Sequence, residues 1–133
     1  MSNTEQYTRR LLEQTDLRFR IFDKPTPTEA ELANLEQRHG LSFPPDYRAF
    51  VLSDGHNYGE FGMDILAPSQ ALAEQARLGD HLLPFAENSC GDWYCWLVDD
   101  LPNAPVVWWD HETETTSDYA DSFMTCLEQW MSS

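Results

Sequence analysis

The residues best suited to chemistry are carboxylates gathered around one histidine near the end of a predicted strand. Asp110, His111 and Glu112 are consecutive, and the residues that could join them in space are Asp92, Glu114 and Asp118. Carboxylates beside an imidazole can act as general acid and base or hold a hard cation. Neighbouring strand residues point to opposite faces, so we expect Asp110 and Glu112 to converge and His111 to face away. We therefore predict no catalytic residue and no metal here, and keep a hydrolase built on the carboxylates as an alternative.

The cysteines suggest a second kind of metal site, which we also do not expect. Cys90 and Cys95 lie near each other in the sequence and have His81 and His111 as conceivable companions, but there is no Cys-x-x-Cys or His-x-x-x-His pair. We predict reduced, buried or partly buried thiols and no cofactor. An odd number of cysteines and an N-terminus without a secretory signal lead us to expect a cytoplasmic protein.

Charge is the most informative bulk property. The chain has 8 Lys and Arg against 23 Asp and Glu, a formal net charge of -15, and no Lys or Arg follows Arg77. Such a field attracts cationic partners and speeds their encounter, and it disfavours nucleic acid. No apolar run approaches the roughly 20 residues that a membrane span needs. The alternative explanation is solubility, because acids next to aromatic strands hinder aggregation.

Residues 91–112 predict a central hairpin around which the chain is organised. Trp, Tyr and Val in residues 93–98 and 106–109 favour strands, and the residues between them favour a turn. Alternation places Trp93, Cys95 and Leu97 on one face opposite Tyr94, Trp96 and Val98, and it places Val106 and Trp108 opposite Val107 and Trp109. Both faces are apolar. Either helices cover both of them, or one is an exposed aromatic surface for a partner; we expect at least one of Trp108 and Trp109 to pack under a helix.

Helical and extended patterns surround this hairpin in a chain long enough for one domain. The first two predicted helices are residues 3–14 and residues 28–39, the latter with a Thr28–Glu31 capping box and a stop at Gly40. A third is opened by Pro44 and Pro45 and buries Tyr47, Phe50 and Val51, and a fourth, residues 68–78, buries Leu72, Ala76 and Leu78. The last is capped by Asp121 or Ser122 and buries Phe123, Leu127 and Trp130 or Met131. The predicted extended segments are 17–22; 61–66; 82–86, at an edge or starting late because of Pro84; and 113–119, at the margin.

Six short motifs, in order along residues 26–127, resemble the SUKH superfamily (SMI/KNR-like), which includes a yeast regulator of cell-wall synthesis and many bacterial immunity proteins. The motifs are Glu29-x-Glu31-Leu32-x-x-Leu35-Glu36 with Gly40, Pro44-Pro45-Asp46-Tyr47-x-x-Phe50, Leu83-Pro84-Phe85-Ala86, Gly91-Asp92-Trp93-Tyr94-Cys95, Val106-Val107-Trp108-Trp109-Asp110-His111-Glu112 and Ala120-Asp121-Ser122-Phe123. Where the family often has Asn-Gly, this chain has Asp54-Gly55-His56-Asn57.

The resemblance implies an α+β domain with a central, mainly antiparallel sheet flanked by helices and no catalysis of its own. It would span residues 1–133, with 1–24 adding a helix and an extended segment. The implied function is binding and neutralising a cognate toxin, often a nuclease and commonly basic; the alternative is a regulatory or scaffold module without a toxin partner. An acidic rim around aromatic anchors is usual in protein interfaces, so our candidate partner-binding residues are Asp92, Trp96, Asp99, Asp100, Trp108, Asp110, Glu112 and Glu114.

Overall fold

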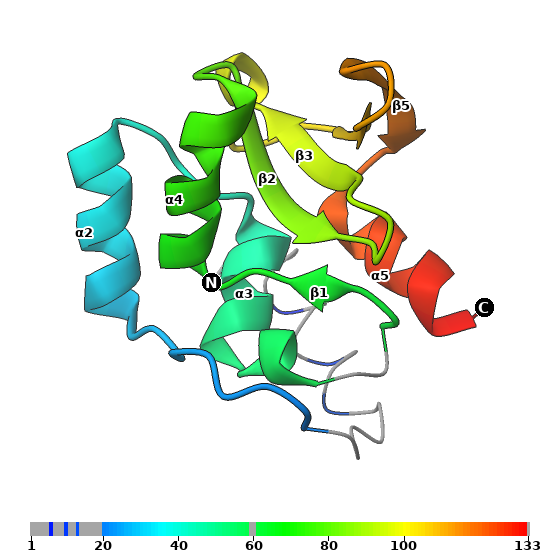
Figure 1. Ribbon diagram of the computed structural model, residues 1–133. Helices are drawn as coiled ribbons and strands as arrows, with labels where there is room; N and C mark the ends of the chain where they lie inside the picture. Colours follow the sequence, from blue (N-terminus) through cyan, green and yellow to red (C-terminus); the bar gives the residue numbers. More distant parts are fainter. Residues whose placement is uncertain (1–5, 7–9, 11–12, 14–19, 59–60, 133) are drawn as a thin grey trace.

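Five antiparallel strands lie side by side in the order in which they follow one another along the chain (Figure 1). The computed structural model describes residues 6, 10, 13, 20–58 and 61–132. The strands are β1 (Asp64–Ile65), β2 (Leu82–Glu87), β3 (Trp93–Leu97), β4 (Val106–Asp110) and β5 (Thr115–Ala120). The helices are α2 (Glu29–His39), α3 (Pro45–Leu52), α4 (Pro68–Leu78) and α5 (Phe123–Ser132), with short 3-10 turns η1 (Gly55–Asn57) and η2 (Val98–Asp100). The predicted α+β fold with an antiparallel sheet is confirmed.

Local capping signals set the helix boundaries. The Thr28 hydroxyl accepts a hydrogen bond from the Glu31 backbone N–H, the Glu31 carboxylate accepts one from the Thr28 N–H, and Gly40 ends α2 at φ 64°. Ser122 Oγ accepts a hydrogen bond from the Thr125 N–H, 3.1 Å away, at the start of α5. In α4 the prediction for Ala76 is wrong: this residue is exposed, and the helix buries Ala71 and Leu72. No described helix is long and apolar enough to span a membrane.

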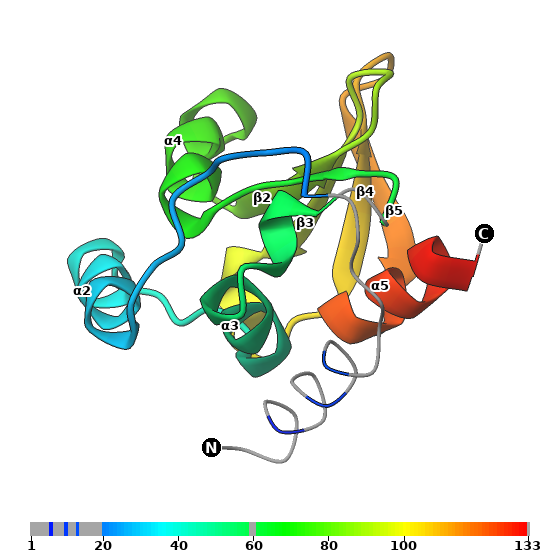
Figure 2. The ribbon, with the colours of Figure 1, turned by 90° about the horizontal axis from the view of Figure 1, so that it is seen from below.

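The main core lies between one face of the sheet and helices α3 and α5, which lie on the same side of it in Figure 2. Trp96 stacks on Phe85 with ring centroids 4.4 Å apart and meets the ring of Tyr47 edge-on at 5.0 Å. Phe123 of α5 joins them, and its ring lies 5.3 Å from Tyr47. The Nε1–H of Trp130 donates to the Tyr119 hydroxyl at 2.9 Å, which fixes α5 against β5. Edge-on and offset aromatic pairs of this kind add to the free energy of area burial.

A smaller apolar cluster occupies the opposite face of the sheet. Its buried residues are Leu82, Cys95 and Val107, and the partly buried residues around them are Leu78, Trp93, Leu97 and Trp109. Trp108 packs against the main core instead. The predicted alternation of the hairpin is thus confirmed, with both faces apolar. Side chains of the strands and the end of α4 shield the second face, and Ile21, 63% exposed, is the large exposed hydrophobic residue among those described.

One edge of the sheet differs from the prediction and the other agrees with it. β1 has two residues instead of the predicted six, and it pairs only with Ala86 and Glu87 of β2. β2 is therefore an interior strand, but Pro84 lies beyond the end of β1, where no neighbouring strand needs its missing N–H. β5 forms the other edge, as predicted. Most of the predicted helix over residues 3–14, and residues 17–19 of the predicted extended segment over 17–22, lie outside the described residues.

Candidate functional site

The end of β4 and the start of β3 meet in a hydrogen-bonded corner built on Asp92. Asp92, 7% exposed, accepts from the His111 backbone N–H at 3.0 Å and from the His111 ring Nδ1–H at 2.6 Å, both through Oδ1. Its Oδ2 accepts from the Asn88 side-chain amide at 3.3 Å. These donors, above all the His111 backbone N–H, lower the pKa of Asp92 to about 2. The hydrogen bond to Asp92 in turn raises the pKa of His111.

The Asp92–His111 contact should stabilise the fold most in mildly acidic solution. Because the folded pKa of His111 lies above the ordinary 6.5, its contribution is present below that pH and is lost as pH rises through the folded pKa. Because the pKa of Asp92 is lowered from 3.8 to about 2, its contribution is present above pH 3.8 and is lost as pH falls toward 2. Urea unfolding over a pH series should show both losses in the native chain.

Two variants separate these terms. His111→Gln should abolish the loss of stability on the alkaline side of pH 6.5, and Asp92→Asn should return the pKa of the His111 ring toward its ordinary value in an NMR titration. A His111 ring that already titrates at or below 6.5 in the native chain would contradict this assignment.

The corner also bears on the expected geometry of the carboxylates. One ligand atom each from Asp92, Asp110 and His111 lie within 4.8 Å of one another. The expectation that His111 faces away was wrong, because β4 ends at Asp110 and His111 lies in the following turn, where strand alternation no longer applies. All three groups are engaged in the fold: Asp92 and His111 bind each other, and Asp110 Oδ1 accepts from the Glu112 N–H at 2.9 Å. The arrangement closes a turn by hydrogen bonds.

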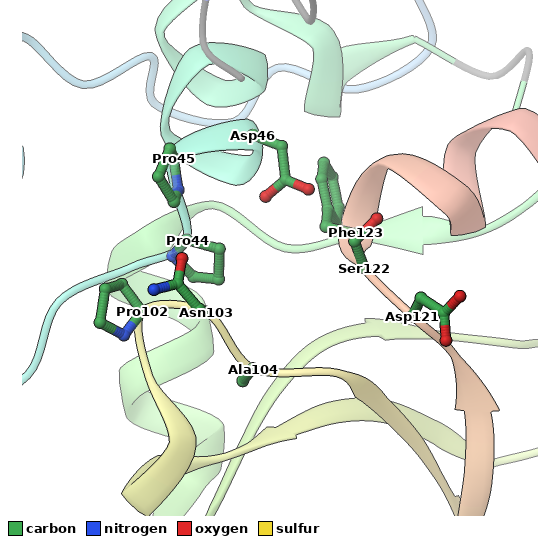
Figure 3. Close-up of a pocket in the computed structure, with 9 residues that line it drawn as sticks. All are labelled: Pro44, Pro45, Asp46, Pro102, Asn103, Ala104, Asp121, Ser122 and Phe123. Carbon is green, nitrogen blue, oxygen red and sulfur yellow. The ribbon is translucent and has the colours of Figure 1, made fainter. Parts of the chain in front are cut away.

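A pocket of about 240 Å³ opens between the N-terminal ends of α3 and α5 (Figure 3). The Asp46 side chain, from the Pro-Pro-Asp-Tyr motif, is directed toward the start of α5 in this view. It is buried and accepts hydrogen bonds from the backbone N–H groups of Tyr47 at 2.8 Å and Met124 at 2.9 Å. Burial raises the pKa of Asp46 despite these bonds. Asp46 thus caps α5 from another helix, which makes it a structural tie between α3 and α5.

The loop over residues 53–58 anchors the segment that precedes α2. The Asn57 carbonyl accepts from the N–H groups of Ile21 and Phe22, and the Asn57 side chain bonds both the N–H and the C=O of Lys24, at 2.7 and 3.0 Å. The Nε2–H of buried His56 donates to the Pro25 carbonyl at 2.9 Å. These contacts assign the loop a structural task, which explains its polar but buried residues.

The structure divides the predicted site residues into two ends of the hairpin and the core. Trp96 is fully buried, so its assignment to a binding surface was wrong. Strand alternation turns its side chain toward α5 and into the main core. Asp92 is also buried, and Trp108 packs against the main core. Asp99 and Asp100 are exposed on η2, after β3. The 5 residues of β3, at roughly 3.4 Å each, separate them from the other acids by about 17 Å.

The remaining candidates gather at the β4–β5 turn. We define the acidic hairpin end as Asp110, Glu112, Glu114 and Asp118; the last three are exposed and Asp110 is half-buried. Glu114 holds the left-handed conformation at φ 55°, which turns the chain into β5. Asp118 was considered from the sequence but not among the binding candidates; its position on an exposed edge strand identifies it here. Asp46 and Asn57 were missed, because their partners are remote in sequence.

Comparisons with known proteins agree with the fold and with the spacing of the motifs. Residues 26–129 match the SMI1 / KNR4 family (SUKH-1). A comparison with curated protein sequences gave no match. The family match covers α2 through most of α5, including the sheet, the Asp92 corner and the Asp46 tie. The chain therefore belongs to the SMI1 / KNR4 family (SUKH-1).

Proposed function

We propose that this protein is an immunity-type binding protein that neutralises a cationic toxin domain by direct contact, without catalysis of its own. The single observation that carries the proposal is the acidic hairpin end, where four acids lie on one turn and edge strand with no Lys or Arg after Arg77 in the chain. Membership of a family whose superfamily includes bacterial immunity proteins supports the same function. A nuclease is the toxin class that the charge fits best, since such enzymes carry cationic surfaces for nucleic acid.

Electrostatics should govern the rate at which such a complex forms. Exposed acids at a rim contribute mainly to association rate and salt dependence. In the same turn, the His111 ring is hydrogen-bonded to Asp92, whose carboxylate balances a positive charge on the ring when His111 is protonated. Several bases of the described chain are ion-paired away from this turn: Arg20 with Asp54, Lys24 with Asp64, Arg48 with Glu29 and Glu36, and Arg77 with Glu74. A cationic surface would therefore meet an uninterrupted negative field at this end of the sheet.

The test is a pull-down with the tagged protein from the source cells at low and high salt, with mass spectrometry of the bound proteins. The recovered toxin domain is then produced in cells with and without this protein, and growth is measured. We expect a basic domain that elutes with salt and growth that is restored. The variant Asp110→Asn, Glu112→Gln, Glu114→Gln should associate more slowly and depend less on salt.

A matched control separates position from total charge. The variant Asp23→Asn, Asp80→Asn, Glu128→Gln removes the same number of negative charges, at exposed positions in other parts of the chain, and it should keep the native association rate within about twofold. Recovery of neutral partners only, or of a basic domain whose toxicity is unchanged by this protein, would favour a regulatory or scaffold module. Equal effects of the two variants on the association rate would mean that the acids at the hairpin end have no specific role in binding, and that the negative charge serves solubility.

A further inference from the structure

The sheet has one edge that can accept another strand. β1, at one side, is two residues long and followed by α4, so it offers little backbone for pairing. β5, at the other side, has six residues, and residues 115–118 pair regularly with β4. No strand in the described part of the chain pairs with the outer side of β5, which lies at the margin of the sheet in Figure 1. Half of its backbone N–H and C=O groups therefore point away from the sheet.

This edge lacks most of the features that usually block strand addition. Its sequence, Thr-Thr-Ser-Asp-Tyr-Ala, contains no proline and no lysine. The register shift in the β4–β5 ladder lies beyond Asp118, toward Ala120, so the first residues remain regular. The side chains of residues 115–118 are exposed and mostly small hydroxyls, which would not obstruct an incoming backbone.

The charge around β5 selects the occupant. The acidic hairpin end supplies Glu112 and Glu114 before the strand and Asp118 within it. A second copy of this chain would bring the same acids and another net charge of -15 to the edge, so like charges would oppose self-pairing. An extended segment with Lys or Arg at alternate positions would instead place its cations on one face of the sheet.

We propose that β5 binds an extended, lysine- or arginine-bearing segment of the partner protein as a sixth strand of the sheet. The proposal rests on the proposed function, in that the partner is a cationic protein. Main-chain hydrogen bonds would supply affinity, and alternate side chains would supply specificity. Thr116 and Asp118 pair with Trp109 and Val107, on the face of the sheet that carries the smaller apolar cluster. A cation at the facing position would lie beside Asp118.

The experiment uses a probe that requires no knowledge of the natural partner. A short acetylated and amidated peptide of alternating Lys and Val is titrated into the full ¹⁵N-labelled chain, followed by amide hydrogen exchange. We expect chemical-shift changes and slowed exchange centred on residues 115–120. The same peptide N-methylated at every residue keeps the charge but cannot donate backbone hydrogen bonds, and it should bind at least about tenfold more weakly.

Charge-reversal variants locate the contact. Asp118→Lys should weaken binding of the Lys–Val peptide about tenfold, whereas Asp80→Lys, with the same change in net charge before β2, should stay within about twofold. Circular dichroism spectra of both variants check that they fold. Equal binding of the N-methylated peptide, protection centred elsewhere, or a dimer formed through β5 in sedimentation would overturn the proposal. A peptide that binds β5 while the pull-down recovers no basic toxin would refute the proposed function and leave the edge site standing.

Discussion

Replacing Trp96 with alanine should lower the free energy of unfolding by about 3 to 5 kcal/mol. The side chain is fully buried and lies between Phe85, stacked at 4.4 Å, and Tyr47, edge-on at 5.0 Å. Its indole Nε1–H has no hydrogen-bond partner in the described part of the chain, so the loss is one of packing and not of a hydrogen bond. Urea unfolding followed by far-UV circular dichroism measures the change.

Trp109→Ala is the matched control in the adjacent strand of the same sheet. Trp109 is half-buried at the margin of the small cluster on the opposite face, so its truncation should cost less than about 2 kcal/mol. Similar losses for the two variants would mean that the two faces of the sheet contribute equally, against the division into a main and a minor core described above.

Gly55→Ala should destabilise the protein by about 2 to 3 kcal/mol, although it adds one methyl group. A Cβ at this position would lie 2.4 Å from Cε2 and 2.6 Å from Cδ2 of Phe50. The ring of Phe50 is fully buried and packs at 5.2 Å against both Phe61 and Phe123, so it has no free direction in which to move. The substitution should also loosen the neighbouring residues that hold the segment over 20–26.

A second substitution tests this cause. Phe50→Leu removes the atoms that the new methyl group would meet, so the double variant should lose less stability than the sum of the two single variants. Ser53→Ala, on the same loop but exposed, should change stability by less than about 0.5 kcal/mol. If the losses from Gly55→Ala and Phe50→Leu simply add, the clash with the ring is not the cause.

Local patterns in the sequence determine much of this fold. Thr28, Glu31 and Gly40 place α2, because each acts on backbone groups within one turn. The alternation from Trp93 to Trp109 predicts the hairpin and its two apolar faces, because neighbouring strand residues point to opposite faces. The alternation does not indicate which face the helices cover, so it is equally compatible with Trp96 at the surface, whereas the packing of Trp96 against Phe123 places it in the core.

Local patterns do not predict contacts between residues that are distant in the sequence. The local sequence predicts that Asp46 is a first-turn residue of its own helix. It does not predict that Asp46 caps α5 through the N–H of Met124, 78 positions later. His111 was misplaced because strand alternation was extended one residue past the end of β4. The acidic hairpin end is easier to predict from the sequence, because Asp110, Glu112 and Glu114 are close together in the chain. What each acid contacts in a complex depends on the partner, which the sequence does not contain.

The consecutive order of the strands has a consequence for how the chain is completed during synthesis. Each strand from β2 to β5 pairs with the one before it, so the sheet can assemble from short turns as it emerges. The cover of its aromatic face is completed later, because α3 precedes the strands but α5 supplies Phe123 and Leu127 only after the last of them. A nascent chain that has finished β5 therefore still exposes the sides of Trp96 and Phe85 that Phe123 covers in the complete fold, and in that interval it resembles the substrates that chaperones bind.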